Sequence, residues 1–377
     1  MSGSDVQHEV PNGPGGSAPA ASHLHGKRHF LLWAYRVVGE LIGMSAVAVV
    51  VITSFWVLAL DWYGERHWFL AMMLYAPALT WVLPALVLLP LSVVFCFRYS
   101  LSLVVFLGAY VLCFWGYEFP GDQKTDADGN RFTVLSNNVG NDGGTSFDDF
   151  AGDFELDAIL LQEARPARFY RERYPNWQVH HAGEFGLLTK LKVIESGVLE
   201  EPTWGAVPVG ARYVIESAHG RRVVLYNIHL PTRRFIISGG GGKGMIAALL
   251  GQGGGYGSQV RAQNRDFFAG QIDLVQRLVK RVGEESDPVI LAGDFNVPAQ
   301  GHLYRLLTTS LDDAFTVSGA GFGYTFPGKT NNPLAFFQPW LRIDHVFTSD
   351  GVTPVRTLVE PDRASQHRAV VAECLLN

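Results

Sequence analysis

The sequence predicts a chain of two unlike parts: an N-terminal bundle of three transmembrane helices, followed by a layered α/β domain. Three observations predict this organisation. At 377 residues the chain is long enough for more than one domain. Apolar residues make up 48% of it and charged residues only 17%, and the apolar excess lies before residue 118. Beyond residue 130, short β-prone runs alternate with helical and polar stretches, which is typical of an α/β domain.

Four segments are expected along the chain. Residues 1–28 are rich in Gly, Pro, Ala and Ser, a composition that predicts a disordered tail. The membrane anchor is expected over 29–117 and a polar linker over 118–130. The α/β domain then occupies 131–377.

Three long runs without a charged residue predict the membrane helices. They are 20, 30 and 19 residues long and cover 41–60, 68–97 and 99–117. A bilayer core needs about 20 apolar residues per helix, so spans are expected near 38–60, 68–90 and 99–117. A buried helical hairpin of a soluble protein is the alternative, but runs of this length favour a membrane. A cleaved signal peptide fits less well, because the first run starts late and two more follow it.

Charges beside these runs predict the orientation. Lys27, Arg28 and Arg36 precede the first span, and Arg98 lies in the second loop. The segment 122–128, after the third span, carries three aspartates and one lysine. Because Lys and Arg favour the cytoplasmic side, we expect a multi-pass protein of the plasma (inner) membrane with its α/β domain outside the cytoplasm.

Nine strands and one long helix are expected in the α/β domain. The helix covers 259–282, where apolar residues recur at helical spacing. The expected strands are 131–138, 157–162, 186–189, 192–199, 211–216, 221–229, 288–293, 342–348 and 369–374.

Polar residues mark the ends of several of these strands. Four apolar runs, at 160–163, 226–230, 291–296 and 342–347, end in or carry a carboxylate, an imidazole or an amide, and 365–368 adds another imidazole. Strand ends place such side chains at the rim of a sheet, where a site can be built on rigid elements. Carboxylates, amides and imidazoles that converge there suit a hard divalent cation and a phosphate ester.

The ordered set N, QE, HL, GDFN, RIDH and S-x-H resembles the endonuclease/exonuclease/phosphatase superfamily over roughly 130–377. That superfamily includes pancreatic-type deoxyribonucleases, abasic-site endonucleases, sphingomyelinases and inositol-polyphosphate phosphatases. The resemblance implies a four-layer sandwich of two mixed β-sheets flanked by helices, with the site at one end. Residues 323–327, followed by the RIDH motif, look most like the bacterial membrane-anchored branch.

The resemblance also implies roles for four residues. Glu163 looks like the principal ligand of Mg²⁺, with Mn²⁺ as the other candidate cation. Asp294 would orient or deprotonate the attacking water, and Asn138 and Asn296 would bind the substrate phosphate. Asp294 and Asn296 are two residues apart, so in extended backbone their side chains face the same way. An Asx turn that caps the strand is the structural alternative for this pair, as a plain surface glutamate is for Glu163.

Three further residues match the family's acid–base positions. His367 looks like the essential imidazole and Asp344 like its carboxylate partner, which would favour the charged imidazolium that stabilises the transition state. His229 matches a second histidine that binds phosphate or protonates the leaving oxygen. The alternative for each histidine is a structural role. His345 should point to the opposite face from Asp344 and is not assigned to the site.

Two positions depart from the family pattern. Gln366 stands where the family usually has an aspartate that contributes to the metal site, and it offers a carbonyl oxygen without a charge. Gly140 stands where nuclease relatives often have an acidic residue. Both changes reduce the negative charge around the expected metal, where Gln366 is assigned as a second ligand.

Charge balance bears on the substrate. From residue 131 onward the chain has 24 Lys and Arg against 26 Asp and Glu, without the basic excess of a dedicated nucleic-acid binder. A membrane anchor favours a lipid head group as the phosphate ester, although a local basic patch would suffice for nucleic acid. No obligate protein partner is implied. A non-catalytic, membrane-anchored binding protein that retains the fold is the second function class, motivated by Gln366.

A Gly-rich segment follows the HL motif. Residues 239–244 lack the Ser or Thr and the glycine spacing of a phosphate-binding P-loop. The longer stretch 238–258 includes an apolar hexapeptide at 245–250. We expect it to border the site, either as a packed lid or as a contact to lipid or substrate.

Overall fold

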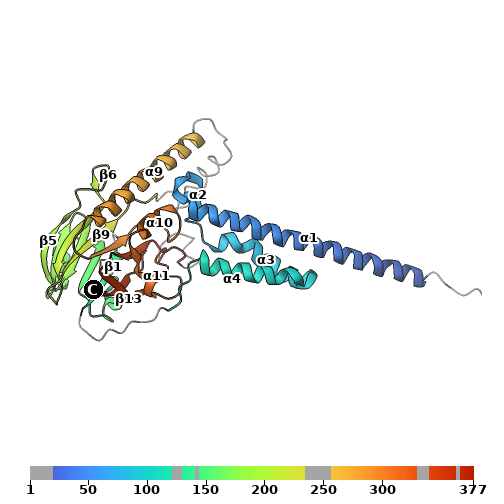
Figure 1. Cartoon of the computed structure of the whole chain (residues 1–377), viewed down its shortest axis with the longest axis horizontal. Helices are drawn as coiled ribbons and strands as arrows, with labels where there is room; N and C mark the ends of the chain where they lie inside the picture. The colour runs from blue at the N-terminus through green and yellow to red at the C-terminus, as the bar shows by residue number, and fades with distance from the viewer. Residues whose placement is uncertain (1–19, 121–129, 141–143, 234–255, 329–338, 362–365) are drawn as a thin grey trace, which may run out of the picture. The chain divides into compact units, whose positions relative to one another are not determined.

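The computed structural model describes residues 20–120, 130–140, 144–233, 256–328, 339–361 and 366–377 (Figure 1). It divides into two compact units. The first is Met1–Val51 with Leu83–Phe106, and the second is Ile52–Val82 with Leu107–Asn377. Most of the predicted tail and linker, and the Gly-rich stretch up to residue 255, lie outside the described residues.

Helices make up the chain from residue 20 to residue 113. They are α1 (Ala20–Trp62), η1 (Gly64–Arg66), α2 (Trp68–Met73), α3 (Leu79–Phe95), η2 (Phe97–Tyr99) and α4 (Ser100–Cys113). Among the described helices, one stretch, Lys27–Trp62, is long and apolar enough to cross a membrane. The apolar helices α3 and α4 have only 17 and 14 residues. The structure therefore supports one full-length span where the sequence predicts three.

The second predicted span, 68–90, is interrupted. Helix α2 ends at Met73 and α3 begins at Leu79, with Pro77 in the break. Proline lacks a backbone N–H and disfavours helical geometry in the residue before it. Met72 of α2 is buried in a cluster with Phe268 of α9 (Tyr256–Gly283). This six-residue helix therefore packs against the α/β domain and does not extend a membrane span.

Two six-stranded sheets form the core of the α/β domain. The first has the order β13-β14-β1-β2-β4-β3 and the second β11-β12-β10-β9-β8-β5. The strands of the first are β1 (Arg131–Asn138), β2 (Ala158–Gln162), β3 (Gln178–Ala182), β4 (Phe185–Thr189), β13 (Val352–Val359) and β14 (Val370–Leu376). Those of the second are β5 (Lys192–Val198), β8 (Gly210–Glu216), β9 (Arg222–His229), β10 (Val289–Asp294), β11 (Asp312–Asp313) and β12 (Asp344–Thr348). A small ribbon pairs β6 (Thr203–Trp204) with β7 (Val207–Pro208).

Both sheets are mixed. The pairs β1–β2 and β9–β10 are parallel, and the other neighbours are antiparallel. Parallel pairing puts the carboxyl ends of β1 and β2 at one edge of the first sheet, and those of β9 and β10 at one edge of the second. These ends carry the polar residues that the sequence marks.

The strands are apolar because most are covered on both faces. Between the sheets, Val134 of β1 packs in one cluster with Ala292 of β10. On the outer face of the second sheet, Leu291 packs with Leu278 of α9 and with α10 (His302–Thr308). On the outer face of the first, Leu135 packs with residues of α5 (Asp148–Ala151) and α6 (Ala167–Arg173). Helix α11 (Ala314–Ser318) follows β11. The predicted fold, two mixed sheets flanked by helices, is confirmed.

The short helix η1, which follows α1, carries a buried glutamate that bonds to α10 within the second unit. Glu65 is 2% exposed, and its Oε2 accepts hydrogen bonds from the backbone N–H groups of His302 and Leu303 at 2.8 and 3.2 Å. Burial raises the pKa of this carboxyl to about 7, against the lowering effect of the backbone hydrogen bonds. The charge of Asp61 raises it further.

We expect Glu65 to make stability depend on pH. A carboxyl whose pKa is raised in the folded state binds a proton more tightly in the folded than in the unfolded protein. Its contribution to the free energy of unfolding is therefore complete below pH 4.5 and is lost as the pH rises through about 7. One pKa unit corresponds to roughly 1.4 kcal/mol. The free energy of unfolding of the wild type, relative to Glu65→Gln, should therefore fall by about 3 kcal/mol across that interval. Denaturant titrations of both full-length proteins in detergent at several pH values measure the difference, and a difference that is constant with pH would contradict it.

Candidate active site

Three polar residues lie side by side on the second sheet. Asp294 is the last residue of β10 and pairs with Asp344, the first residue of β12. On its other side Asp294 pairs with His229, the last residue of β9. Directly opposed residues of neighbouring strands project to the same face of a sheet. Strand register therefore brings together residues that are up to 115 positions apart in the sequence.

A glycine makes this close arrangement of β9 and β10 possible. Gly293 has φ 150°, and a Cβ atom at this position would lie 1.9 Å from the carbonyl oxygen of Ile228. No side chain fits at that distance. Gly293 therefore allows β10 to carry Asp294 next to His229.

The first sheet contributes an asparagine and a glutamate. Asn138 ends β1 and is level with Gln162, and Glu163 follows directly after β2. The Nδ2 group of Asn138 donates to Asp294 Oδ2 at 3.0 Å and lies 3.5 Å from Glu163 Oε1. Asn138 thus connects the two sheets at the end where the polar residues meet. Its Oδ1 accepts a hydrogen bond from the N–H of Gly140.

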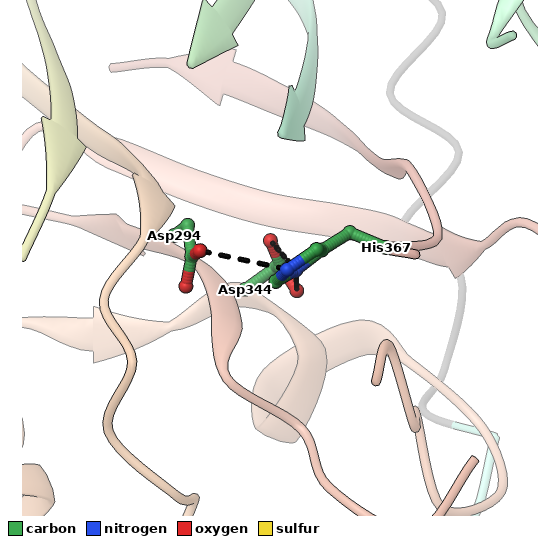
Figure 2. A group of neighbouring side chains, drawn as sticks. All are labelled: Asp294, Asp344 and His367. Carbon is green, nitrogen blue, oxygen red and sulfur yellow. Dashed lines mark hydrogen bonds and ion pairs between the residues drawn. The ribbon is translucent and has the colours of Figure 1, made fainter. Parts of the chain in front are cut away.

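His367 completes the cluster from the loop before β14. Its Nδ1 lies 3.0 and 3.1 Å from the two carboxylate oxygens of Asp344, and its Nε2 lies 3.7 Å from Asp294 Oδ2. Figure 2 shows these contacts from the His367 ring to both carboxylates. All three residues are buried, and the Phe326 ring lies against the imidazole at a centroid distance of 4.9 Å. The predicted Asp344–His367 pair is present.

Burial changes the acidity of Asp294. Removal from water raises the pKa of this carboxyl, and the neighbouring Asp344 acts in the same direction. His367, His229 and Asn138 partly oppose the shift, and the net pKa lies above its ordinary value. A carboxylate with a raised pKa is a stronger base, which suits the role of accepting a proton from water.

His229 has a partner that the sequence did not indicate. Its Nδ1 lies 2.8 Å from Glu184 Oε1, in the turn between β3 and β4, and its Nε2 lies 3.7 Å from Asp294 Oδ2. Burial acts to lower the pKa of His229, but the hydrogen bond with Glu184 and the charges of Asp294, Glu184 and Glu163 raise it overall. A glutamate after a glycine in a hairpin turn carries no motif, so only the fold identifies Glu184.

Asn296 adopts the Asx turn that the sequence offers as the structural alternative, and not the extended backbone. It has φ 50°, and its N–H donates to Asp294 Oδ1 at 2.9 Å, which is the geometry of an Asx turn. Its Nδ2 donates to the carbonyl of Leu230 at 2.9 Å, with one amide hydrogen remaining. The turn and a substrate-binding role are thus compatible.

Strained backbone coincides with the site. Among the described residues, Glu163 and Asn296 are the non-glycine residues with positive φ, each 50°. Such a conformation costs about 1–3 kcal/mol and persists where surrounding contacts enforce it. Both residues were assigned from the sequence as functional.

Gln366 directly precedes His367 in the loop before β14. It is exposed, and its backbone oxygen accepts a hydrogen bond from Gly328 at 2.6 Å. The group whose ligand atoms lie within 4.8 Å of one another consists of Asp294, Asp344 and His367. His345, which the sequence excluded, is buried on other contacts, with Nε2 2.9 Å from the oxygen of Val297.

The donor chemistry of the cluster fits a hard divalent cation. Asp294 accepts a hydrogen bond from Asn138, Asp344 pairs with His367, and Glu163 is half-buried with its Oε1 3.5 Å from Asn138 Nδ2. Carboxylate and amide oxygens of this kind are the ligands that Mg²⁺ prefers. Glu163 adds a further carboxylate at this end of the sheets, beside Asn138.

A family model described as "Endonuclease/Exonuclease/phosphatase family" matches residues 134–367. No match was found among curated proteins.

Several solved structures are similar to the chain. An endonuclease/exonuclease/phosphatase family protein from Bacteroides thetaiotaomicron is 18% identical, with 66% of this chain and 98% of that one covered and a TM-score of 0.45. The human Nocturnin catalytic domain is 15% identical, with coverages of 66% and 95% and a TM-score of 0.43. A 3′ phosphatase from Neisseria, bound to a product DNA hairpin, is 15% identical, with coverages of 64% and 98% and a TM-score of 0.41.

Replacement of Glu184 by Gln should lower the pKa of His229. The substitution removes the charge and weakens the hydrogen bond that favour the protonated imidazole. Histidine NMR titration of the metal-free protein measures the shift, with the His229 signal assigned from a His229→Asn sample. Glu195→Gln, on exposed strand β5, is the matched control and should leave this pKa unchanged. An unchanged His229 titration in Glu184→Gln would contradict the assigned contact.

Proposed function

Because the chain belongs to the Endonuclease/Exonuclease/phosphatase family, we propose that it is a membrane-anchored phosphoesterase that requires a divalent metal. One observation carries the proposal. The imidazole of His367 lies between two buried carboxylates, and one of these, Asp294, also accepts a hydrogen bond from Asn138 of the opposite sheet. A buried imidazole beside a carboxylate of raised pKa is an arrangement that clusters at functional sites.

Asp294 is proposed as the group that orients and deprotonates the attacking water. Its Oδ1 is occupied by the N–H of Asn296, and its Oδ2 by Asn138, so the carboxylate is held in one orientation. Its raised pKa increases its basicity. A proton taken from water would reside on this carboxylate.

The two histidines are proposed to act on the phosphate. Asp344 holds His367 through Nδ1, so that Nε2 carries a proton toward the site and stabilises negative charge developing on a phosphate oxygen. His229, whose pKa Glu184 helps to raise, is proposed to donate a proton to the leaving oxygen. The side-chain amides of Asn138 and Asn296 would position the remaining phosphate oxygens.

A divalent cation, Mg²⁺ or Mn²⁺, is proposed as the cofactor, with Glu163 as its principal ligand. When bound, it would supply Lewis-acid stabilisation of the phosphate. Gln366 is proposed as a second contributor to the metal site from its motif position, and its side chain is exposed.

Membrane attachment is supported by exposed apolar side chains on three helices. Ile52 and Phe55 of α1 are 66% and 72% exposed, Val94 of α3 is 61% exposed, and Leu101 and Val105 of α4 are 69% and 62% exposed. Soluble proteins rarely leave so much apolar surface uncovered. We propose that α1 crosses the bilayer, that α3 and α4 are embedded with it, and that the α/β domain lies outside the cytoplasm.

The proposed substrate is a phosphodiester or phosphomonoester at or near the membrane surface, such as a lipid head group. Nucleic acid is the second candidate. The near-equal numbers of basic and acidic residues from residue 131 onward support the lipid, because a dedicated nucleic-acid binder carries a basic excess.

Hydrolysis should require a divalent cation. We expect the full-length protein to cleave p-nitrophenyl phosphate or its bis(p-nitrophenyl) diester with Mg²⁺ or Mn²⁺, and to lose activity in excess chelator. Glu163→Ala should raise the metal concentration needed for half-maximal rate, because it removes a charged ligand. Glu172→Ala, an exposed glutamate paired with Arg168, is the control. Full activity in chelator would refute the metal role, and inactivity on phosphodiesters, phospholipids, DNA and inositol phosphates alike would favour the non-catalytic binding protein.

Asp344 and His367 should behave as one unit. Loss of a positioned acid or base costs about two to four orders of magnitude in rate, so His367→Ala and Asp294→Asn should each approach that loss. Asp344→Ala added to His367→Ala should cost little more, because the carboxylate acts through the imidazole. His181→Ala, an exposed histidine of β3, should retain activity. Losses of Asp344 and His367 that add in full would count against the pair.

A further inference from the structure

The loop between β10 and α10, residues 295–301, carries Asn296 and is held by contacts on both sides. The N–H of Phe295 donates to the oxygen of Ile343 at 3.0 Å, and the oxygen of Val297 lies 2.9 Å from Nε2 of His345. Asn296 between them makes the bonds to Asp294 and Leu230 described above. None of these contacts provides a hydrogen-bond donor to the backbone carbonyl oxygen of Asn296.

A tyrosine that precedes the residues matched by the family model donates a hydrogen bond to this carbonyl oxygen. The hydroxyl of Tyr75, in the break between α2 and α3, donates to the carbonyl oxygen of Asn296 at 2.8 Å. Tyr75 is itself held, because Nε1 of Trp340 donates to its backbone oxygen at 3.2 Å. Tyr75 packs beside a buried cluster that includes Trp340 and Ile343, next to Asp344 in the chain. A residue 59 positions before the start of the family match therefore touches the substrate-binding loop.

The far end of the same loop is held from the same part of the chain. Glu65 accepts from the first N–H groups of α10, as described, and Nε2 of Gln300 donates to the oxygen of Phe114 at 2.8 Å. Gly301 has φ 92°, and a Cβ there would lie 2.7 Å from Leu74 and 2.9 Å from Glu65. The loop is thus fixed at both ends by residues that the family match does not include.

We propose that Tyr75 is a positioning residue that holds the strained backbone of Asn296 so that its side-chain amide faces the substrate phosphate. This inference rests on the proposed function for its kinetic consequence. The segment 63–78, which connects α1 and α3, is then part of the catalytic unit.

The physical reason is the positive φ of Asn296. An asparagine with positive φ returns to a more favourable backbone conformation unless surrounding contacts hold it. A buried carbonyl oxygen without a hydrogen-bond donor is unfavourable, so loss of the donor favours a shift of the backbone. Movement of a substrate-binding group by about 1 Å can cost on the order of 100-fold in rate. Removal of one hydroxyl can thus affect catalysis without contact between Tyr75 and substrate.

The test is Tyr75→Phe in the full-length protein in detergent, with Mg²⁺ and the two p-nitrophenyl esters as probes. We expect kcat to fall about tenfold or more while KM and the metal titration change little, because the interaction is needed in the transition state. Tyr110→Phe is the matched control, since its hydroxyl also donates to a backbone oxygen, that of Ala78, at 2.7 Å, outside the loop. Equal kcat values for the two variants would overturn the proposal.

A double-mutant cycle separates positioning from general loss of stability. If Tyr75 acts through Asn296, Tyr75→Phe should cost less than about twofold in kcat when added to Asn296→Ala. A full additional loss in that background would overturn the assignment. The assignment would also be overturned if Tyr110→Phe lowered both the melting temperature and kcat by the same amounts as Tyr75→Phe.

Hydrogen exchange tests the inference without any activity. Tyr75→Phe should speed exchange of the amides of residues 295–297, which the wild type and Tyr110→Phe protect equally. Unchanged protection in Tyr75→Phe would overturn the inference even in an active enzyme. A wild type that hydrolyses neither ester would instead count against the proposed function, and faster exchange in Tyr75→Phe would still support the contact of Tyr75 with the loop.

Discussion

The site depends on one hydrogen bond between the two sheets, from the side-chain amide of Asn138 to the carboxylate of Asp294. Apolar packing between the sheets is not directional, so it specifies their relative alignment less sharply than polar contacts do. The Asn138 bond, together with the buried bond from Gln162 to Asn227 at 2.6 Å, specifies one alignment at this end. An unmatched polar group there would cost about 1–3 kcal/mol, so other alignments are disfavoured. The carboxylate, amide and imidazole groups of the candidate site thereby lie close together at this end of the sheets.

Much of this could be predicted from the sequence, for a physical reason. A strand buried on both faces must be apolar, so a polar residue at its end is conspicuous, and parallel neighbours bring such ends together. Asn138, Glu163, His229 and Asp294 each follow this pattern, and the predicted strands lie within two residues of those observed. The helix predicted over 259–282 is observed as Tyr256–Gly283.

Other elements gave weaker signals. Strand β13 contains Pro354, which usually argues against a strand, and it is tolerated because β13 is an edge strand with a register shift at that point. Strand β3, also at an edge, is largely polar. The contacts of Glu184 and Tyr75 join distant segments without periodicity or motif, so only the fold brings them to the site. Hydropathy predicts a membrane span over α2 because it does not reveal that this helix packs against α9.

The contact between Glu65 and α10 also has a consequence for how the protein is made. Glu65 and His302 are 237 residues apart in the sequence. At typical rates of translation, roughly 10 to 50 s therefore pass between the synthesis of Glu65 and that of His302. During this interval the carboxylate has no α10 amides to bind and stays hydrated. Helix α1 is synthesised long before the strands of the two sheets. The contact between Glu65 and α10 can therefore form only late in synthesis, when the C-terminal half of the chain becomes available.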